Sequence, residues 1–127
     1  MKSEILAAAR KLVEAFGAHD TAAYFGSFAA DATFVFHTTA QPLRSRADYE
    51  KLWYGWEQAG FRVLSCESSD QHVQVLGDVA VFTHRVRTVV LSDGAEETSH
   101  ERETIVFRRE DDGRWLAVHE HLSGAPQ

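Results

Sequence analysis

The chain has 127 residues, which is enough for one domain with one hydrophobic core, and we expect a single domain over residues 1–127. Hydrophobic residues make up 44% of it and charged residues 25%, a balance that is typical of folded proteins and excludes disorder over most of the length. The 13 Lys and Arg residues are outnumbered by 19 Asp and Glu, the net charge is −6, and no long basic block is present. We therefore expect no nucleic acid partner, because a protein that tracks phosphates needs a positive face.

The number of cysteines and the first residues of the chain indicate the cellular compartment. Cys66 is the only cysteine, so the chain can form neither an intrachain disulfide nor a cysteine-based zinc site, which suits a reducing cytoplasm. Charged residues interrupt the apolar residues of segment 1–16, which argues against a signal-peptide core or a membrane span there. We expect a cytoplasmic protein with no membrane partner.

The first third of the chain predicts two helices and a strand. Apolar residues recur at the three- and four-residue spacing of one helical face between Ser3 and Gly17, which are suited to begin and end a helix. Asp20 is suited to cap a second, shorter helix that reaches Phe28. The β-branched and aromatic residues at 33–38 then predict a strand.

A third helix and four strands follow. Ser45 and Asp48 match the S-x-x-[DE] signal that opens a helix, and Gly60 is suited to end it. From residue 61 onward the apolar residues alternate with a period of two, which is typical of strands. Helices followed by a run of strands indicate an α+β fold, in which a curved antiparallel sheet wraps around three N-terminal helices and leaves room for a pocket. The predicted strands lie near residues 61–76, 79–91, 98–109 and 114–122, joined by short turns at 77–78, 92–94 and 111–113.

Three phrases carry a resemblance to a known superfamily: Asp-Ala-Thr-Phe-Val-Phe at 31–36, Leu-Gly-Asp-Val-Ala-Val-Phe at 76–82 and Gly-Arg-Trp-Leu-Ala-Val-His-Glu-His-Leu-Ser-Gly-Ala-Pro at 113–126. With the order of elements, they resemble the nuclear-transport-factor-2-like superfamily, and within it the SnoaL-like and ketosteroid-isomerase-like bacterial proteins. The last phrase is also similar to the C-terminal strand of the calcium/calmodulin-dependent kinase II association domain. The resemblance implies a cone-shaped sheet, a pocket for a small organic molecule without a cofactor, and a homodimer through the outer face of the sheet. It does not settle the function, because the superfamily includes isomerases, cyclases, dehydratases and binding modules.

The resemblance also implies two residues for acid–base catalysis. His37 falls about where the general base of ketosteroid isomerases lies, and Glu103 about where their oxyanion-stabilising acid lies. An unperturbed imidazole, with a pKa of about 6.5, can accept a proton at neutral pH, whereas a buried Glu needs a raised pKa to donate one. The chain departs from those isomerases, because their base is a carboxylate and the tyrosine of their first helix is Leu12 here. A steroid isomerase as such is therefore not expected.

Arg87 and Glu120 complete the candidate catalytic set. Arg87 aligns with an arginine that the association domains point into their pocket, where a guanidinium can hold a carboxylate. Two companion arginines of that pocket fall at Ile105 and Leu122, so we expect a more apolar cavity. Glu120 shares the strand parity of Leu122 and is expected to face the same cavity. Structural alternatives stay open: a strand-end hydrogen bond of His37, an ion pair of Glu103 with Arg85, and an ion pair of Arg87 with Glu120.

A histidine pair near the C-terminus raises the question of a metal site. His119 and His121 are two residues apart on one predicted strand, so both side chains leave the same face. His84 lies two strands away, roughly 10 Å off by the interstrand spacing, which is too far to complete a site. We therefore expect no metal site and keep a histidine-based metal protein only as a less favoured alternative. The resemblance implies that both histidines lie on the outer face, where the superfamily forms dimers.

The rest of the lining is predicted to be apolar. Five aromatic residues are expected in the core or at the mouth of the cavity: Phe16, Tyr24, Phe28, Trp53 and Trp56. The resulting hypothesis is acid–base catalysis on a small cyclic or polyketide-like ketone, by isomerisation, aldol-type cyclisation or dehydration. His37 takes or relays a proton, and Glu103 or Arg87 stabilises negative charge on a carbonyl oxygen. The alternative is a ligand-binding or assembly module in which the same residues form a salt-bridged lining.

Overall fold

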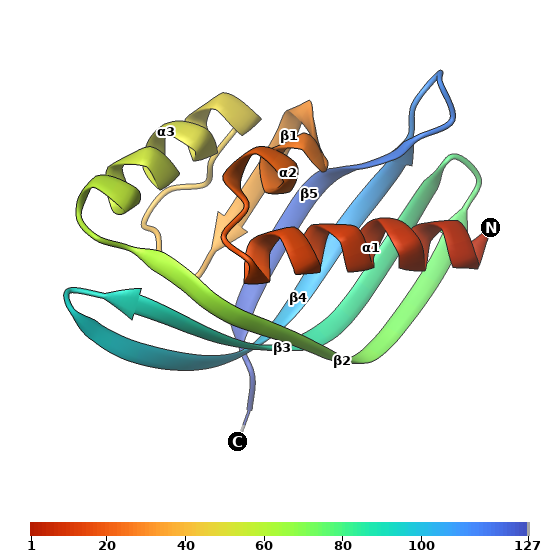
Figure 1. The fold of residues 1–127 in the computed structure, drawn as a ribbon. Coiled ribbons are helices and arrows are strands. Elements are labelled where there is room, and N and C mark those ends of the chain that lie inside the picture. The colour runs from red at the N-terminus through yellow and green to blue at the C-terminus, as the bar shows by residue number, and fades with distance from the viewer. Residues whose placement is uncertain (127) are drawn as a thin grey trace.

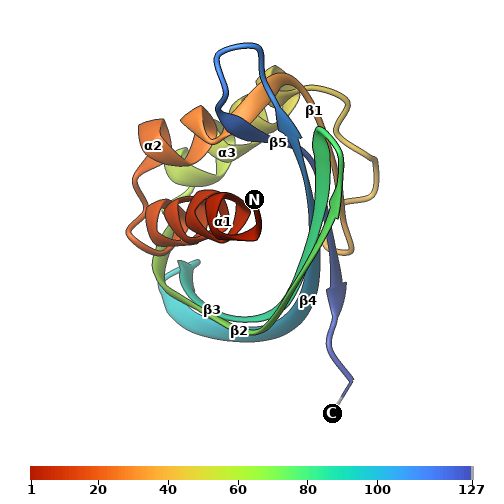
Figure 2. The same ribbon diagram turned by 90° about the vertical axis from the view of Figure 1, so that its right-hand side faces the viewer.

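The computed structural model describes residues 1–126 as three helices packed into the concave side of one curved sheet (Figure 1). Figure 2 looks nearly along the first helix, and the strands curl around it. This is the predicted α+β arrangement. Among residues 1–126, no helix is both long and apolar enough to cross a membrane. In chain order the elements are α1 (Lys2–Gly17), α2 (Thr21–Gly26), β1 (Phe28–Phe36), α3 (Arg46–Gln58), β2 (Arg62–Leu76), β3 (Val79–Ser92), β4 (Ala95–Arg109) and β5 (Trp115–Gly124).

Two of the three predicted helix caps are present. The Asp20 carboxylate accepts a hydrogen bond from the backbone N–H of Ala23 at 3.2 Å, and the Ser45 hydroxyl accepts one from Asp48 at 3.1 Å. The prediction for Ser3 is wrong, because α1 already begins at Lys2 and the Met1 backbone takes the capping position. A side-chain cap is favoured but not required at an exposed helix end, where water can satisfy the free N–H groups.

The first strand differs most from its prediction. β1 begins at Phe28, which was expected in the second helix, and ends at Phe36. The second helix stops at Gly26, so the extended chain starts five residues before the predicted residue 33. β1 also pairs in parallel with β5, which follows at the far end of the chain.

The other strands form the predicted antiparallel meander. The strand order in the sheet is β1-β5-β4-β3-β2, and every pair except β1 with β5 is antiparallel. Asp93 and Gly94 both have positive φ angles, of 53° and 79°, as a tight hairpin turn with matching twist requires. Register shifts interrupt the β2/β3 and β4/β5 ladders. Such bulges bend a strand, and they help to give the sheet its concave face.

The core lies between this concave face and the helices. Side chains that alternate along each strand point inward and pack against α1 and α3. The largest buried side chains are aromatic or branched: Trp53, Phe28, Phe34, Phe82, Phe107, Ile5, Leu12, Ile105 and Val63. Part of the concave face, between the helices and strands β3 to β5, stays open as a cavity.

The Ser45 cap gives a direct test of how α3 begins. Replacing Ser45 with Ala leaves the Asp48 N–H of α3 without its partner, and we expect the free energy of unfolding to fall by about 1 kcal/mol. Ser3→Ala is the matched control, since Ser3 caps no helix, and it should change stability by less than about 0.5 kcal/mol. Urea denaturation of both variants measures the difference, and equal effects would contradict this account.

Candidate functional site

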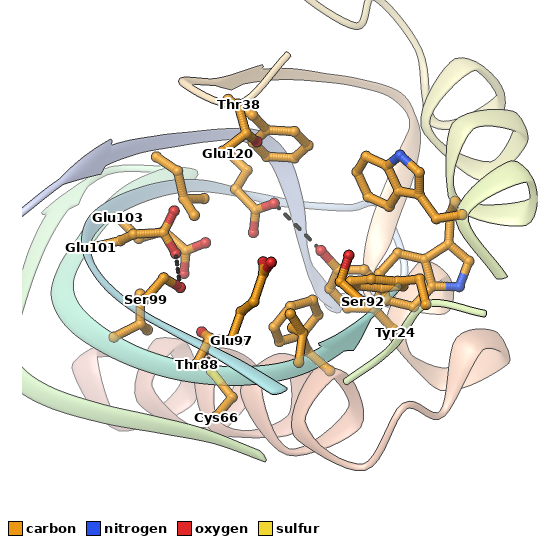
Figure 3. Close-up of a pocket in the computed structure, with 18 of the residues that line it drawn as sticks. Tyr24, Thr38, Cys66, Thr88, Ser92, Glu97, Ser99, Glu101, Glu103 and Glu120 are labelled. Carbon is orange, nitrogen blue, oxygen red and sulfur yellow. Dashed lines mark hydrogen bonds between the residues drawn. The ribbon is translucent and has the colours of Figure 1, made fainter. Parts of the chain in front are cut away.

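A cavity of about 570 Å³ lies between the concave face of the sheet and the helices (Figure 3). Its walls come from α1, α2, α3 and the inward positions of β2 to β5, because successive side chains of a strand point to opposite faces. The exposed lining residues His37, Asp93 and Glu97 place the mouth between the end of β1 and the β3–β4 hairpin. The volume falls in the range of small-molecule sites.

Aromatic rings form one wall of the cavity. Trp53 and Trp56 of α3 lie 6.3 Å apart between ring centroids, and Phe61 lies 5.4 Å from each of them. Phe16 and Tyr24 continue this wall toward α1. Tilted and edge-on packing of this kind holds the rings in fixed positions, so the wall is preformed for a flat, apolar molecule.

Three glutamates reach the cavity from two neighbouring strands. Glu101 and Glu103 occupy alternate inward positions of β4, and Glu120 occupies an inward position of β5. Glu101 and Glu103 are each 8% exposed and Glu120 is 2% exposed. Burial of Glu103 and Glu120 close together disfavours their charged forms and raises the pKa of both carboxyl groups.

Glu120 lies at the inner end of a chain of tyrosines. The Tyr24 hydroxyl donates to Glu120 Oε1 at 3.4 Å, and it lies 2.9 Å from the Tyr49 hydroxyl. Because Tyr24 gives its hydrogen to Glu120, Tyr49 donates to Tyr24. Burial raises the pKa of Glu120 well above its ordinary value, and the neighbouring Glu103 raises that pKa further. Both effects favour the protonated form of Glu120.

Glu103 is hydrogen-bonded to a histidine of the neighbouring strand β3. Nε2 of His84 lies 2.6 Å from Glu103 Oε1, and Nδ1 of His84 lies 2.6 Å from the Ser68 hydroxyl. One assignment of hydrogen-bond donors is consistent with all three contacts. Gln71 donates to the Ser68 hydroxyl, Ser68 donates to His84 Nδ1, and His84 Nε2–H donates to Glu103. Burial lowers the pKa of His84 to about 4 and raises the pKa of Glu103 to about 7. The imidazole is therefore neutral, and Glu103 can gain or lose a proton near neutral pH.

His37 belongs to a third pair, at the mouth of the cavity. Its Nε2 lies 2.6 Å from Glu101 Oε2, and the Ser99 hydroxyl donates to the other oxygen of Glu101 at 3.2 Å. The His37 side chain is 42% exposed, so this pair connects the cavity with solvent. The strand-end hydrogen bond that the sequence left open for His37 is therefore present, with Glu101 as the partner.

The prediction that Arg87 points into the cavity is wrong. Arg87 lies on the outer face of β3, where its guanidinium is 3.7 Å from the Glu67 carboxylate and 46% of the side chain is exposed. Arg85 has the same parity and lies 3.7 Å from Asp70, not from Glu103. Both ion pairs that the sequence left open, Arg85 with Glu103 and Arg87 with Glu120, are therefore wrong as well. The inward positions of β3 are the even-numbered ones, such as His84.

Most of the other sequence-predicted residues do meet at one cavity. Phe28 and Ile105 do not, because both are fully buried in the core beneath it, and their prediction as lining residues is wrong. The predicted residues that line the cavity are His37, Glu103, Glu120, Phe16, Tyr24, Trp53, Trp56 and Leu122.

Three polar residues of the site were missed by the sequence reasoning. Glu101 could have been predicted from the sequence, because it lies two positions before Glu103 and therefore on the same face of the strand. No short-range pattern marks the Tyr49 hydroxyl as part of a site, because its hydroxyl partner Tyr24 is 25 residues away. His84 faces Glu103 across the β3/β4 ladder, so it could be found only once the strand register was known.

His119 and His121 lie on the outer face of β5, as their parity predicted. Nδ1 of His119 is 2.8 Å from the Thr33 hydroxyl of β1, so this ring contacts the neighbouring strand. Among residues 1–126, no group of three or more His, Cys, Asp or Glu side chains is arranged to hold a metal ion.

Cys66 lines the cavity from β2, and its thiol is unreactive. Burial raises the pKa of Cys66 to about 12, so the sulfur keeps its proton at neutral pH. The Thr88 hydroxyl donates to this sulfur at 3.7 Å. A thiol of this kind is a packed side chain and not a nucleophile.

Comparison with known proteins agrees with this architecture. A nuclear-transport-factor-2-like superfamily protein from Salmonella enterica serovar Typhimurium superposes with a TM-score of 0.85 at 18% sequence identity, covering 99% of this chain and 92% of that one. A ketosteroid isomerase-like protein from Erwinia carotovora atroseptica gives 0.81 at 17% identity, covering 98% and 96%. A putative calcium/calmodulin-dependent protein kinase II association domain from Xanthomonas campestris gives 0.79 at 19% identity, covering 98% and 87%.

At these identities the solved structures establish the fold and leave the chemistry open. The family model for the SnoaL-like domain matches residues 5–127, which is nearly the whole chain. The chain therefore belongs to the SnoaL-like domain family, and its fold is that of the nuclear-transport-factor-2-like and ketosteroid-isomerase-like proteins.

Proposed function

We propose that the protein binds a small, largely apolar carbonyl compound in this cavity and moves a proton on it without a cofactor. The observation that carries the proposal is the pair of buried carboxyl groups, Glu103 and Glu120, which face one aromatic-walled cavity from adjacent strands. Buried titratable groups with displaced pKa values in a cleft are typical of acid–base sites. Isomerisation, aldol-type cyclisation and dehydration all begin with such a proton transfer.

In this proposal Glu103 is the base. Its carboxylate removes a proton from the carbon next to the substrate carbonyl, the C–H electron pair forms a C=C bond, and the carbonyl π electrons move to oxygen. A base with a pKa near the working pH is the most effective, and burial brings Glu103 into that range. The N–H of His84 orients the carboxylate and stabilises its charged form. The proton then returns from Glu103 to carbon.

Glu120 is the acid. Because burial and Glu103 favour its protonated form, Glu120 can donate a hydrogen bond to the oxygen on which the negative charge develops. Tyr24 holds Glu120 in place by donating a hydrogen bond to its Oε1 atom, and the Tyr49 hydroxyl is hydrogen-bonded to Tyr24 in turn. Arg87 has no part in this step, since it lies on the opposite face of the sheet.

His37 acts at the mouth as a relay. It is half-exposed and bound to Glu101, so it can exchange protons between solvent and the carboxyl groups inside. Of the two roles that the sequence hypothesis gave His37, taking a proton or relaying it, this proposal keeps the relay. We expect its removal to slow turnover less than the removal of Glu103.

A ligand-binding module without catalysis is the second candidate. It is favoured by the hydrogen bonds that the carboxyl groups already make within the protein, with His84 for Glu103 and with Tyr24 for Glu120. Buried groups satisfied in this way can be purely structural. The predicted homodimer and the cytoplasmic location stay predictions under either candidate.

Deuterium exchange separates the two candidates. Wild-type protein is incubated in D₂O with a panel of small cyclic ketones, and loss of the α-proton signal is followed by NMR. We expect acceleration by the wild type, a loss of about 10²-fold or more for Glu103→Gln, and a smaller loss for His37→Ala. Glu67→Gln, on the outer face, is the control and should retain the wild-type rate. If the wild type accelerates no exchange, the catalytic proposal is wrong and the binding module remains.

The proton on Glu120 can be tested through stability. A carboxyl whose pKa is higher in the folded chain than its ordinary 4.5 binds a proton more tightly when folded, so its contribution to stability is lost as pH rises. Glu120→Gln cannot ionise. We therefore expect the variant to gain stability relative to the wild type between about pH 5 and pH 8, by about 1 kcal/mol or more. Urea denaturation at several pH values measures this, with the exposed Glu67→Gln as control, and a pH-independent difference would contradict it.

A further inference from the structure

The titratable side chains that line the cavity are mostly acidic. Its acidic lining residues are Asp93, Glu97, Glu101, Glu103 and Glu120, and its one basic residue is His37. None of the 13 Lys and Arg residues, all of which lie within the described residues 1–126, lines it. Figure 3 shows the side chains of Glu97, Glu101, Glu103 and Glu120 directed into the same space.

The strand pattern separates the two signs of charge. Along β3 and β4 the acidic positions 101 and 103 face inward, whereas Arg85, Arg87 and Arg102 point to the outer face. The outer arginines are partly neutralised by their own partners, Asp70 and Glu67. Inside the cavity, no guanidinium or ammonium group balances the carboxyl groups.

This lining selects among ligands by their charge. An anionic ligand would add a negative charge beside these carboxyl groups, and repulsion between charges is screened less inside a protein cavity than in bulk water. A neutral ligand would gain only the apolar contacts. A cationic ligand would supply the opposite charge that the carboxyl groups lack, and it would also be attracted to the faces of the tryptophan rings.

We propose that the cavity binds an organic cation. Its aromatic or alicyclic body packs against the wall of Trp53, Trp56 and Phe61, and its ammonium group lies among the glutamates of β4 and β5. The cavity itself, with its ligand-sized volume and fixed aromatic wall, establishes the site, and the carboxyl groups select the charge.

A cation in this cavity rests on the proposed function and narrows the class of substrate that the protein would act on. If both hold, the substrate is an amino ketone. An enolate that forms in this cavity has no arginine beside it, because Arg87 is outside. The ammonium group of the substrate would then offset the charge that develops on oxygen, together with the hydrogen bond from Glu120. Binding of the cation does not require catalysis, so it can be measured independently of deuterium exchange.

Three probes with the same ring system test the charge preference. Binding of 1-naphthylmethylammonium, 1-naphthalenemethanol and 1-naphthoate to the wild-type protein is measured by isothermal titration calorimetry near neutral pH. We expect the ammonium compound to bind about tenfold or more tightly than the alcohol, with one molecule per chain, and the naphthoate to bind most weakly. Equal affinities, or tightest binding of the naphthoate, would overturn the inference and leave the cavity as a site for another class of ligand. Binding of none of the three would overturn it as well.

Charge-removing variants locate the preference in the cavity. We expect Glu97→Gln to weaken binding of the ammonium probe by about threefold or more and to leave binding of the alcohol within about twofold. Glu97 is exposed at the mouth, so its substitution does not disturb the buried part of the fold. Glu67→Gln removes the same charge from the outer face and should bind like the wild type. A loss as large for Glu67→Gln as for Glu97→Gln would mean that the overall negative charge of the protein attracts the probe, and it would overturn the assignment to the cavity.

Discussion

The burial of Glu103 and Glu120 on the concave face of the sheet is the constraint on which the site depends. Moving a carboxylate out of water is costly unless it keeps a proton or gains a hydrogen-bond donor, and both happen here. Glu103 gains the N–H of His84, and Glu120 keeps its proton beside Tyr24. The identity of the surrounding polar residues follows from this requirement, because each one satisfies an atom that burial would otherwise leave unpaired.

The curvature of the sheet leaves a cavity beside these buried carboxyl groups. The strands of the meander curl around the helices, and their inward positions face α1, α2 and α3 across a hollow. Aromatic residues of α3 fill one side of the hollow and carboxyl groups of β4 and β5 the other. A molecule inside would therefore contact an apolar wall and a polar wall together, which is the usual design of a small-molecule site.

Membership of the SnoaL-like family predicts the fold of the chain better than it predicts its chemistry. Alignment with association domains suggested an inward Arg87, yet the side chain lies outside and contacts Glu67. A shift of one position along a strand reverses the face of a side chain, so alignment at low identity transfers the fold without transferring the lining. The acidic lining of this cavity is consequently a property of this chain, and it has to be interpreted from its own residues.

The sequence by itself determined what depends on near neighbours in the chain. The caps at Asp20 and Ser45, the meander and its turns follow from hydrogen bonds and alternation that span only a few residues. The tertiary structure alone decided the pairing of β1 with β5, the contact of His84 with Glu103, and the depth at which Phe28 lies. Those features depend on strand register and on bulges, which are set by the packing of the whole sheet against the helices, and no local pattern encodes them.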